Sequence, residues 1–331
     1  MLLYPLRRHP KKCALVAYLC YVMYTKRQRE AAAAAAAAAS ALQRKGFATV
    51  NGVELYFEFY GDESKPKLLF VPGSMCDLRK PMYQQALTVL SEHFHVLAYD
   101  HRGMGQSTMD TESSHYSMAG YANDACALCE NMGWDSCHVM GVSFGGMVAQ
   151  EIALRAPQLL HSHSLVLACT SAGGSGGSSI ALHKLARLSD FSFGYQFIRK
   201  TDTNLQKWHW SWMPVLSGFL FMVLGKAKHL DPDKREVYWN TCRHLQFMAR
   251  NHHDTTDRLG SLCCRTLVCG GDRDEVAPVQ NLRALHRLIP GAVLMLFSGG
   301  HGFLAQDPRA LTAVIAFMLG SMPPGKMCKA K

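Results

Sequence analysis

Ser143 is the residue whose surroundings most clearly predict chemistry. It lies in the sequence Gly-Val-Ser-Phe-Gly-Gly (141–146), between an apolar run that predicts a buried strand (137–140) and one that predicts a helix (147–154). A serine on a sharp strand-to-helix turn needs small neighbours, because a Cβ two residues away would collide with the adjoining strand or helix. The spacing therefore predicts a serine nucleophile. It also places the backbone N–H of Phe144 at a helix N-terminus, where it can stabilise an oxyanion.

A second Gly-x-Ser-x-Gly sequence occurs around Ser175, as can happen by chance in a chain with 27 glycines. It follows Cys-Thr-Ser-Ala and precedes further Gly and Ser, so neither a strand nor a helix flanks it. We therefore interpret Ser175 as a loop residue.

A serine hydroxyl becomes a good nucleophile when a histidine takes its proton and an acid holds that histidine. His301, flanked by glycines, follows the apolar run 292–297, and Asp274 follows the run 264–269. Because the carboxyl ends of parallel strands meet at one edge of a sheet, Ser143, Asp274 and His301 can converge although they lie far apart in the sequence. They are our candidates for nucleophile, acid and base.

The elements that must position these residues alternate along the chain. Short apolar runs, typical of buried strands, alternate with amphipathic or capped segments that predict helices, which indicates a mostly parallel sheet covered by helices on both faces. The predicted strands are 67–71, 96–99, 137–140, 164–168, 264–269 and 292–297, and the predicted helices are 82–90, 117–132, 147–154, 279–288 and 307–318. Asn51-Gly52 predicts a hairpin before them.

The alternation breaks over residues 173–260, which are mostly helical in character. An insertion at this point fits a lid over the carboxyl ends of the strands, and its tryptophans suggest an apolar substrate pocket or contact with a lipid surface. Trp208 and Trp212, together with Met75, are the candidate pocket residues. Packing of the lid against the core is the alternative explanation for such residues.

The formal net charge of +10 is concentrated at the N-terminus. Residues 1–29 carry seven basic side chains and no acidic one, which leaves +3 for the rest of the 331-residue chain. A basic leader on a near-neutral body favours targeting or membrane contact and disfavours nucleic-acid binding. Its apolar run, 13–24, is too short to span a bilayer. We expect membrane association or mitochondrial targeting through this leader, with a disordered tail on a cytoplasmic protein as the alternative.

These patterns divide the chain into four parts. Residues 1–43 form a leader with a poly-alanine spacer, 44–172 and 261–322 form the core, 173–260 form the lid, and 323–331 form a tail. The 12 cysteines are scattered through predicted strands and helices, so we expect most to be reduced and buried.

Together these motifs resemble the α/β-hydrolase family, and in particular its lidded esterase, lipase and lactonase branch. The resemblance covers roughly residues 47–318 and rests on the sequence around Ser143, the acid loop 271–278 and the Gly-Gly-His-Gly sequence 299–302. The loop 100–107 resembles the family's Asp-x-Arg-Gly-x-Gly-x-Ser pattern, and the order serine, acid, histidine also matches. The resemblance implies an α/β-hydrolase fold with a helical lid.

The resemblance also bears on the choice of the acid and on the oxyanion loop. Asp274, four residues before Pro278, fits the family pattern better than Asp272, which we expect to hold the turn. The family's usual His-Gly in the oxyanion loop is Pro72-Gly73 here, which leaves backbone donors available, and we expect the N–H of Ser74 to be the second oxyanion donor.

The predicted activity is hydrolysis of a carboxylic ester through an acyl-enzyme, without metal or cofactor. A lipophilic ester such as an acylglycerol is the preferred substrate, given the tryptophan-rich lid and the basic leader. Two alternatives stay open: acyl transfer to an alcohol or thiol by the same residues, and a non-catalytic protein of this fold that binds a membrane or a partner.

Overall fold

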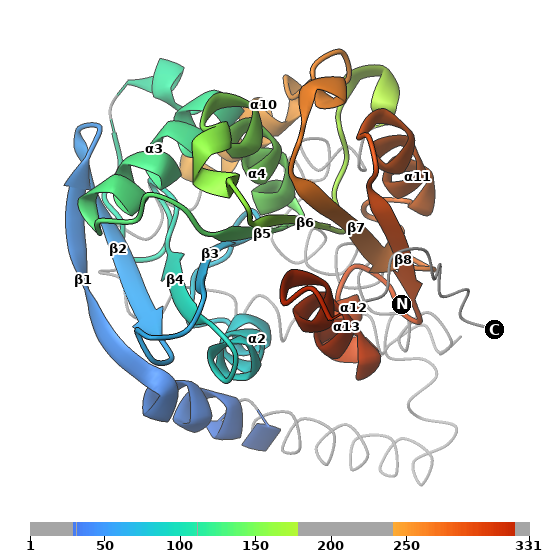
Figure 1. Ribbon diagram of the computed structural model, residues 1–331. Coiled ribbons are helices and arrows are strands. Elements are labelled where there is room, and N and C mark those ends of the chain that lie inside the picture. The colour runs from blue at the N-terminus through green and yellow to red at the C-terminus, as the bar shows by residue number, and fades with distance from the viewer. Residues whose placement is uncertain (1–28, 31, 111, 178–240, 322–331) are drawn as a thin grey trace, which may run out of the picture.

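A single eight-stranded sheet organises the molecule (Figure 1). The computed structural model describes residues 29–30, 32–110, 112–177 and 241–321. The strand order is β1-β2-β4-β3-β5-β6-β7-β8. The β1–β2 and β2–β4 pairings are antiparallel and the others are parallel. The strands are β1 (Leu42–Val50), β2 (Val53–Tyr60), β3 (Lys67–Val71), β4 (His95–Tyr99), β5 (His138–Val142), β6 (Ser164–Ala168), β7 (Arg265–Gly271) and β8 (Val293–Phe297).

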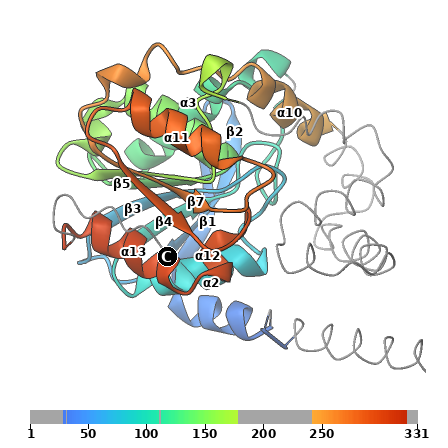
Figure 2. The same cartoon turned by 90° about the vertical axis from the view of Figure 1, so that its right-hand side faces the viewer.

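Helices cover both faces of the sheet, which explains why its central strands are mainly apolar (Figures 1 and 2). One face carries α3 (Met118–Asn131), α4 (Phe144–Arg155) and α11 (Val279–Leu288), and the other carries α2 (Pro81–Ser91), α12 (Phe303–Gln306) and α13 (Arg309–Met318). Each layer encloses its own cluster of buried apolar side chains. The predicted α/β-hydrolase fold, with its mostly parallel sheet between two helical layers, is therefore confirmed.

Two further helices and four short 3-10 helices also belong to the described fold. A helix over residues 32–41 precedes β1, and α10 (Arg243–Asn251) precedes β7. The short 3-10 helices are η1 (Ser113–His115), η2 (Pro157–Leu160), η3 (Gly174–Gly176) and η5 (Leu259–Ser261).

Local sequence signals account for several element boundaries. Asn51 and Gly52 join β1 to β2 with φ values of 46° and 79°, as a tight hairpin turn requires. The Ser117 side chain accepts a hydrogen bond from the Gly120 N–H and caps α3. β1 begins at Leu42, and Ala38, in the alanine tract before it, is buried in the cluster that also contains side chains of α2 and α13.

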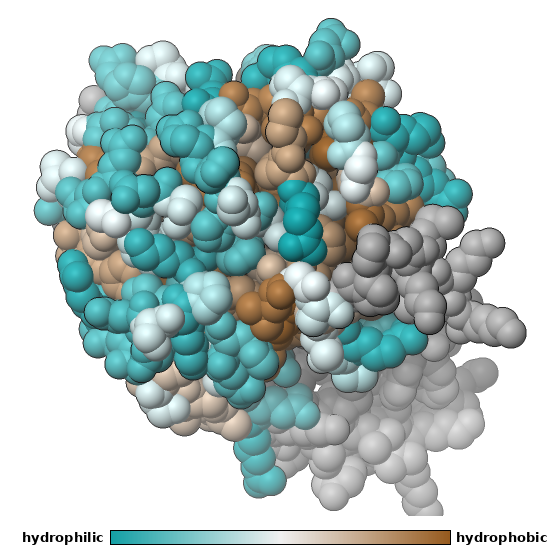
Figure 3. All heavy atoms as spheres, viewed as in Figure 1, coloured by the Kyte–Doolittle hydropathy of each residue, from teal (hydrophilic) through white to brown (hydrophobic). Residues whose placement is uncertain are grey.

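The described surface is mainly hydrophilic in the view of Figure 3. Among the described residues, the large hydrophobic side chains that are exposed are Phe47, Met82, Met248 and Leu319. In the same part of the chain, no helix combines the length and hydrophobicity that a membrane crossing requires.

Several predictions concern residues outside the described ranges. Most of the predicted lid lies there, with Trp208 and Trp212, as do most of the predicted leader and the tail from residue 322. The predicted lid is described at its two ends, 173–177 and 241–260.

Candidate active site

The turn that carries Ser143 is held by close backbone contacts. Ser143 has φ 57° and ψ −115°, which is a rare conformation for a residue with a side chain. A Cβ on Gly141 would lie 2.2 Å from the Gly145 carbonyl oxygen, and one on Gly145 would lie 2.1 Å from the Val71 carbonyl oxygen. The Ser143 N–H donates to the Ala168 carbonyl at 2.8 Å. The two glycines of the motif are therefore required by the packing of β5, α4 and β3.

Ser143, His301 and Asp274 form a continuous hydrogen-bonded chain. The Ser143 Oγ lies 2.9 Å from His301 Nε2, and His301 Nδ1 lies 2.8 Å from Asp274 Oδ2. Because a carboxylate only accepts, Nδ1 carries the imidazole proton and Nε2 is free to accept one from the serine. The His301 side chain is 13% exposed and that of Asp274 is fully buried. The structure thus brings together the three residues that the sequence singled out.

The two acidic residues of the loop after β7 occupy different positions. Asp274 Oδ1 accepts the N–H groups of Val276 and Ala277 at 2.7 and 2.9 Å, so its own loop fixes the carboxylate. Asp272 Oδ1 accepts the Gly299 N–H at 3.0 Å, and its side chain is half-exposed. Asp274 faces His301, whereas Asp272 ties the loop after β7 to the loop after β8.

The loop between β3 and α2 faces the serine. A Cβ on Gly73 would lie 3.6 Å from the Ser143 Cβ. In the part of the chain that the structure describes, neither the Ser74 N–H nor the Phe144 N–H has a hydrogen-bond acceptor. Met75 is buried in this loop with φ 57°, and its N–H donates to Gln246 Oε1 at 2.8 Å. The N–H of Met75 is therefore occupied, and that of Ser74 is available.

Side chains from distant elements hold this loop in place. The Gly73 N–H donates to the Tyr83 hydroxyl in α2 at 2.7 Å, and His101 Nε2 donates to the Pro72 carbonyl at 2.9 Å. Burial lowers the pKa of His101 to about 4, so its ring is neutral at neutral pH. Gln246, in α10, is the third side chain that holds the loop, through its bond to the Met75 N–H. The loop is thus braced by α2, by the segment after β4 and by α10.

The predicted Asp-x-Arg-Gly segment serves as a brace for the same loop. Asp100 is buried and accepts the Leu78 and Gln106 N–H groups at 2.9 Å, and it also pairs with Arg79. Arg102 is buried and makes two 2.6 Å hydrogen bonds to the Asp124 carboxylate in α3. A paired and hydrogen-bonded charge is the form in which such groups are tolerated inside a protein.

Two of the residues that support the site had no signal in the sequence. Gln246 lies 171 positions from Met75, and nothing around it predicts a contact with the loop after β3. Thr170, the second residue after β6, donates a hydrogen bond from its Oγ1 to the Ser143 carbonyl at 2.7 Å. Both contacts depend on which segments the tertiary structure brings together.

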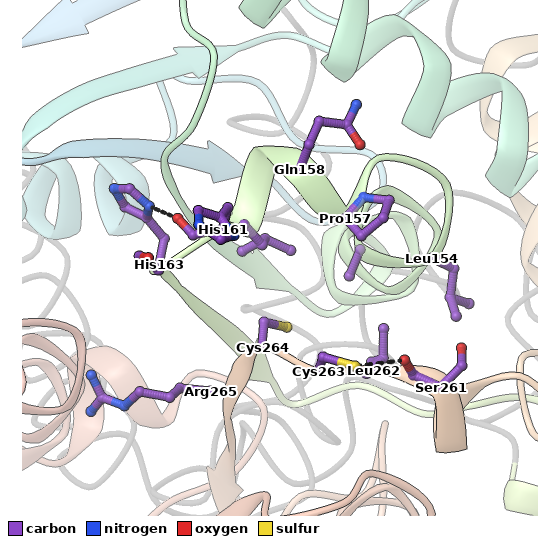
Figure 4. A pocket seen from close by; sticks show the side chains of 13 residues that line it. Leu154, Pro157, Gln158, His161, His163, Ser261, Leu262, Cys263, Cys264 and Arg265 are labelled. Carbon is purple, nitrogen blue, oxygen red and sulfur yellow. Dashed lines mark hydrogen bonds between the residues drawn. The ribbon is translucent and has the colours of Figure 1, made fainter.

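A separate cavity of about 500 Å³ lies at the opposite edge of the sheet (Figure 4). His163 precedes β6 and Arg265 begins β7, so the cavity adjoins the amino ends of β6 and β7, whereas Ser143, Asp274 and His301 follow the carboxyl ends of β5, β7 and β8. Its lining includes Cys263 and Cys264. The His163 Nδ1 donates a hydrogen bond to the His161 carbonyl. The cavity is therefore remote from Ser143.

Comparison with known proteins places this geometry in context. The family model described as alpha/beta hydrolase fold matches residues 68–308. A putative carbamate hydrolase RutD of Pseudomonas syringae is 27% identical over 238 residues, covering 72% of this chain and 88% of the relative. A hydrolase of Pseudomonas aeruginosa has a similar structure, with a TM-score of 0.65 and 24% identity over 84% of this chain and 98% of the other. An enol-lactonase of Burkholderia xenovorans also superposes with a TM-score of 0.65, at 21% identity over 83% of this chain and 100% of the other.

Proposed function

The chain is a hydrolase that belongs to the alpha/beta hydrolase fold family, and on that premise we propose that it cleaves a carboxylic ester through an acyl-enzyme on Ser143. The observation that carries this proposal is the hydrogen-bonded chain from Ser143 Oγ through His301 to Asp274, with heavy-atom distances of 2.9 and 2.8 Å. Distances of this kind allow proton transfer without rearrangement.

The geometry suggests a two-stage reaction. Ser143 Oγ attacks the ester carbonyl while His301 Nε2 takes its proton, and the buried Asp274 carboxylate stabilises the imidazolium. His301 then gives the proton to the departing alcohol, which leaves the acyl group on Ser143. In the second stage His301 takes a proton from water, whose oxygen attacks the acyl-enzyme and releases the acid. These steps need no metal or cofactor.

Two backbone N–H groups are candidates for the oxyanion hole. Phe144 is the first residue of α4, so its N–H has no partner within the helix and points from the positive end of the helix dipole. The Ser74 N–H lies in the loop that packs against the Ser143 turn. Preorganised donors of this type commonly lower the barrier by about 3 kcal/mol each.

A fluorophosphonate probe tests the proposal directly. The probe should label the purified full-length chain, and mass spectrometry should place the adduct on Ser143. The Ser143→Ala variant should lose the label, whereas Ser175→Ala should keep it. Absence of labelling, or a label that persists in Ser143→Ala, would contradict the serine mechanism.

A lipophilic ester such as an acylglycerol is the substrate class we propose, from the tryptophans of the predicted lid and the basic leader. Hydrolysis rates across esters of increasing acyl length should rise with chain length. A sharp preference for acetyl esters or small lactones would overturn this choice. Addition of a competing alcohol or thiol to the same assay would reveal acyl transfer in place of hydrolysis.

Carbamate hydrolysis is a second candidate, because the Pseudomonas syringae relative carries that description. A carbamate carbonyl can be attacked by the same serine, so the triad serves either substrate. Matched carbamate and ester substrates that share one leaving group would separate the two activities. A higher kcat/KM for the carbamate would favour this second function.

We also propose contact with a membrane surface through residues 1–29 and the lid. Flotation of the inactive Ser143→Ala protein with lipid vesicles tests binding independently of catalysis. If the Ser143→Ala protein floats, and the parent chain neither hydrolyses an ester nor transfers an acyl group, the non-catalytic alternative gains support.

A further inference from the structure

Cys169 occupies a central place at the edge of the sheet that carries the triad. It is the first residue after β6, which lies between β5, leading to Ser143, and β7, leading to Asp274. Its N–H donates to the Cys269 carbonyl in β7 at 2.8 Å, and its φ is 42°, which is unusual for a residue other than glycine. The residue is 1% exposed. The fold thus holds its thiol among the loops of the active site.

Cys169 adds a sulfur ligand to a carboxylate and an imidazole. One ligand atom from each of Cys169, Asp274 and His301 lies within 4.8 Å of the other two. Ligand atoms in a tetrahedral zinc site are about 3.3 to 3.6 Å apart, so shifts of about 1 Å would close this cluster around an ion. In the part of the chain that the structure describes, no other three His, Cys, Asp or Glu side chains come this close together.

We propose that Cys169, Asp274 and His301 form an inhibitory site for a thiophilic divalent cation such as Zn²⁺ or Cd²⁺. A thiolate, an imidazole and a carboxylate suit these ions better than Mg²⁺ or Ca²⁺, which prefer oxygen ligands. Metal binding itself does not depend on the proposed hydrolase activity, whereas its inhibitory effect rests on that activity.

Proton positions explain why bound metal would stop the reaction. The His301 nitrogen that faces Asp274 is Nδ1. When the metal takes this nitrogen, the imidazole proton moves to Nε2, which then donates and cannot accept the proton of Ser143. The Cys169 thiol loses its proton to solvent as the metal–sulfur bond forms, so one proton is released for each ion bound. Burial and the Asp274 carboxylate raise the pKa of this thiol, so it is protonated in the metal-free protein.

Cadmium binding can be measured without any assay of activity. The full-length chain, titrated with CdCl₂, should show the ultraviolet charge-transfer band of a cadmium–thiolate bond. The Cys169→Ala and Cys169→Ser variants should each lose one bound ion per chain relative to the parent. Ser143→Ala keeps all three ligands and should bind as the parent does. Equal cadmium stoichiometry in the parent and in a folded Cys169 variant would overturn the proposal.

Inhibition provides the second readout. Zn²⁺ should inhibit ester hydrolysis reversibly, with recovery on addition of a chelator, and the inhibition constant should rise by at least about 100-fold in Cys169→Ser. Cys269→Ala removes a neighbouring buried thiol outside the cluster and should leave the inhibition constant unchanged. Equal inhibition of the parent and Cys169→Ser would contradict the site. If cadmium binding needs Cys169 but the chain hydrolyses no substrate, the metal site stands and the proposed function fails.

Discussion

Two sets of loops meet at the active edge of the sheet, and they are held in different ways. The Ser143 turn and the Asp274 loop are held mainly by backbone groups: glycines permit the turn, the Ser143 N–H donates to the Ala168 carbonyl, and two neighbouring N–H groups bind the Asp274 carboxylate. One side chain, that of Thr170, adds a hydrogen bond to the Ser143 carbonyl. The loop 72–75 is fixed by side chains from far away in the sequence, among them Gln246. In the proposed mechanism, the backbone-held parts carry the groups that react, and the loop 72–75 carries a donor that would stabilise the charge they develop.

The largest loss of activity should follow from replacing Asp274, the acid held by backbone N–H groups. Asp274→Asn should lower kcat by on the order of 10,000-fold, because an amide at this position no longer enforces the reactive tautomer of His301. Asp272→Asn is the matched control on the same loop and should retain most of the activity. Steady-state ester hydrolysis measures both. Comparable losses in the two variants would mean that the loop acts through its fold and that Asp274 has no specific role.

The close approach of the Ser143 turn to β3 should be sensitive to a single methyl group. A Cβ in Gly145→Ala would lie 2.1 Å from the Val71 carbonyl oxygen, so the free energy of unfolding should fall by about 3 kcal/mol. Gly260→Ala meets nothing within 4 Å and should change stability by about 0.5 kcal/mol or less. Urea denaturation compares them. Equal stability of the two variants would show that the turn is less tightly packed than these contacts indicate.

Gln246 tests the side-chain-held loop. Gln246→Met removes the acceptor of the Met75 N–H, so the neighbouring Ser74 N–H should lose its alignment. We expect kcat to fall by about 10- to 100-fold with little change in KM, because an oxyanion donor acts mainly in the transition state.

Gln150→Met is the matched control, because Gln150 is also a fully buried glutamine bonded to backbone groups, at Gly146 and Ser171. It should lower stability without a comparable loss in kcat. A Gln246→Met protein that loses stability but keeps its kcat would show that α10 has a purely structural role.

Stability should also depend on pH, through buried histidines. Burial lowers the pKa values of His101, His138 and His253 to about 4, whereas an unfolded histidine titrates near 6.5. Between pH 6.5 and 4 the unfolded chain binds protons that the folded chain does not, so each residue should lower the free energy of unfolding by on the order of 1 to 2 kcal/mol as the pH falls from 7 to 5. Burial raises the pKa of Asp100 to about 6, which acts in the opposite direction and offsets part of the loss.

The His101→Gln variant isolates how much of this pH dependence of stability comes from the histidine that bonds the Pro72 carbonyl. The variant should flatten the pH dependence of stability, measured by urea denaturation at several pH values. His161→Gln, at an exposed position, should leave it as in the parent. An unchanged pH dependence in His101→Gln would mean that this histidine is not held neutral in the folded protein.

Much of the fold and of the candidate site could be predicted because the signals are local. The hairpin at Asn51-Gly52, the capping serine of α3 and the apolar strands all report their structure within a few residues. The same holds for Ser143, Asp274 and His301, since each lies at the end of a recognisable strand in a loop of small or acidic residues. Boundaries were less exact: α13 begins at Arg309, after Pro308, and Asp307 binds the Arg309 N–H.

The alternation of strands and helices, and the placement of Ser143, Asp274 and His301 after strand ends, could therefore be predicted, because strand periodicity and turn chemistry act between near neighbours. The contacts around these three residues could not, because they come from long-range packing. Gln246 reaches Met75, and Cys169 comes within 4.8 Å of Asp274 and His301, because β6 lies between β5 and β7 in the sheet. Such contacts depend on strand order and on packing between distant segments, and no short stretch of sequence encodes either.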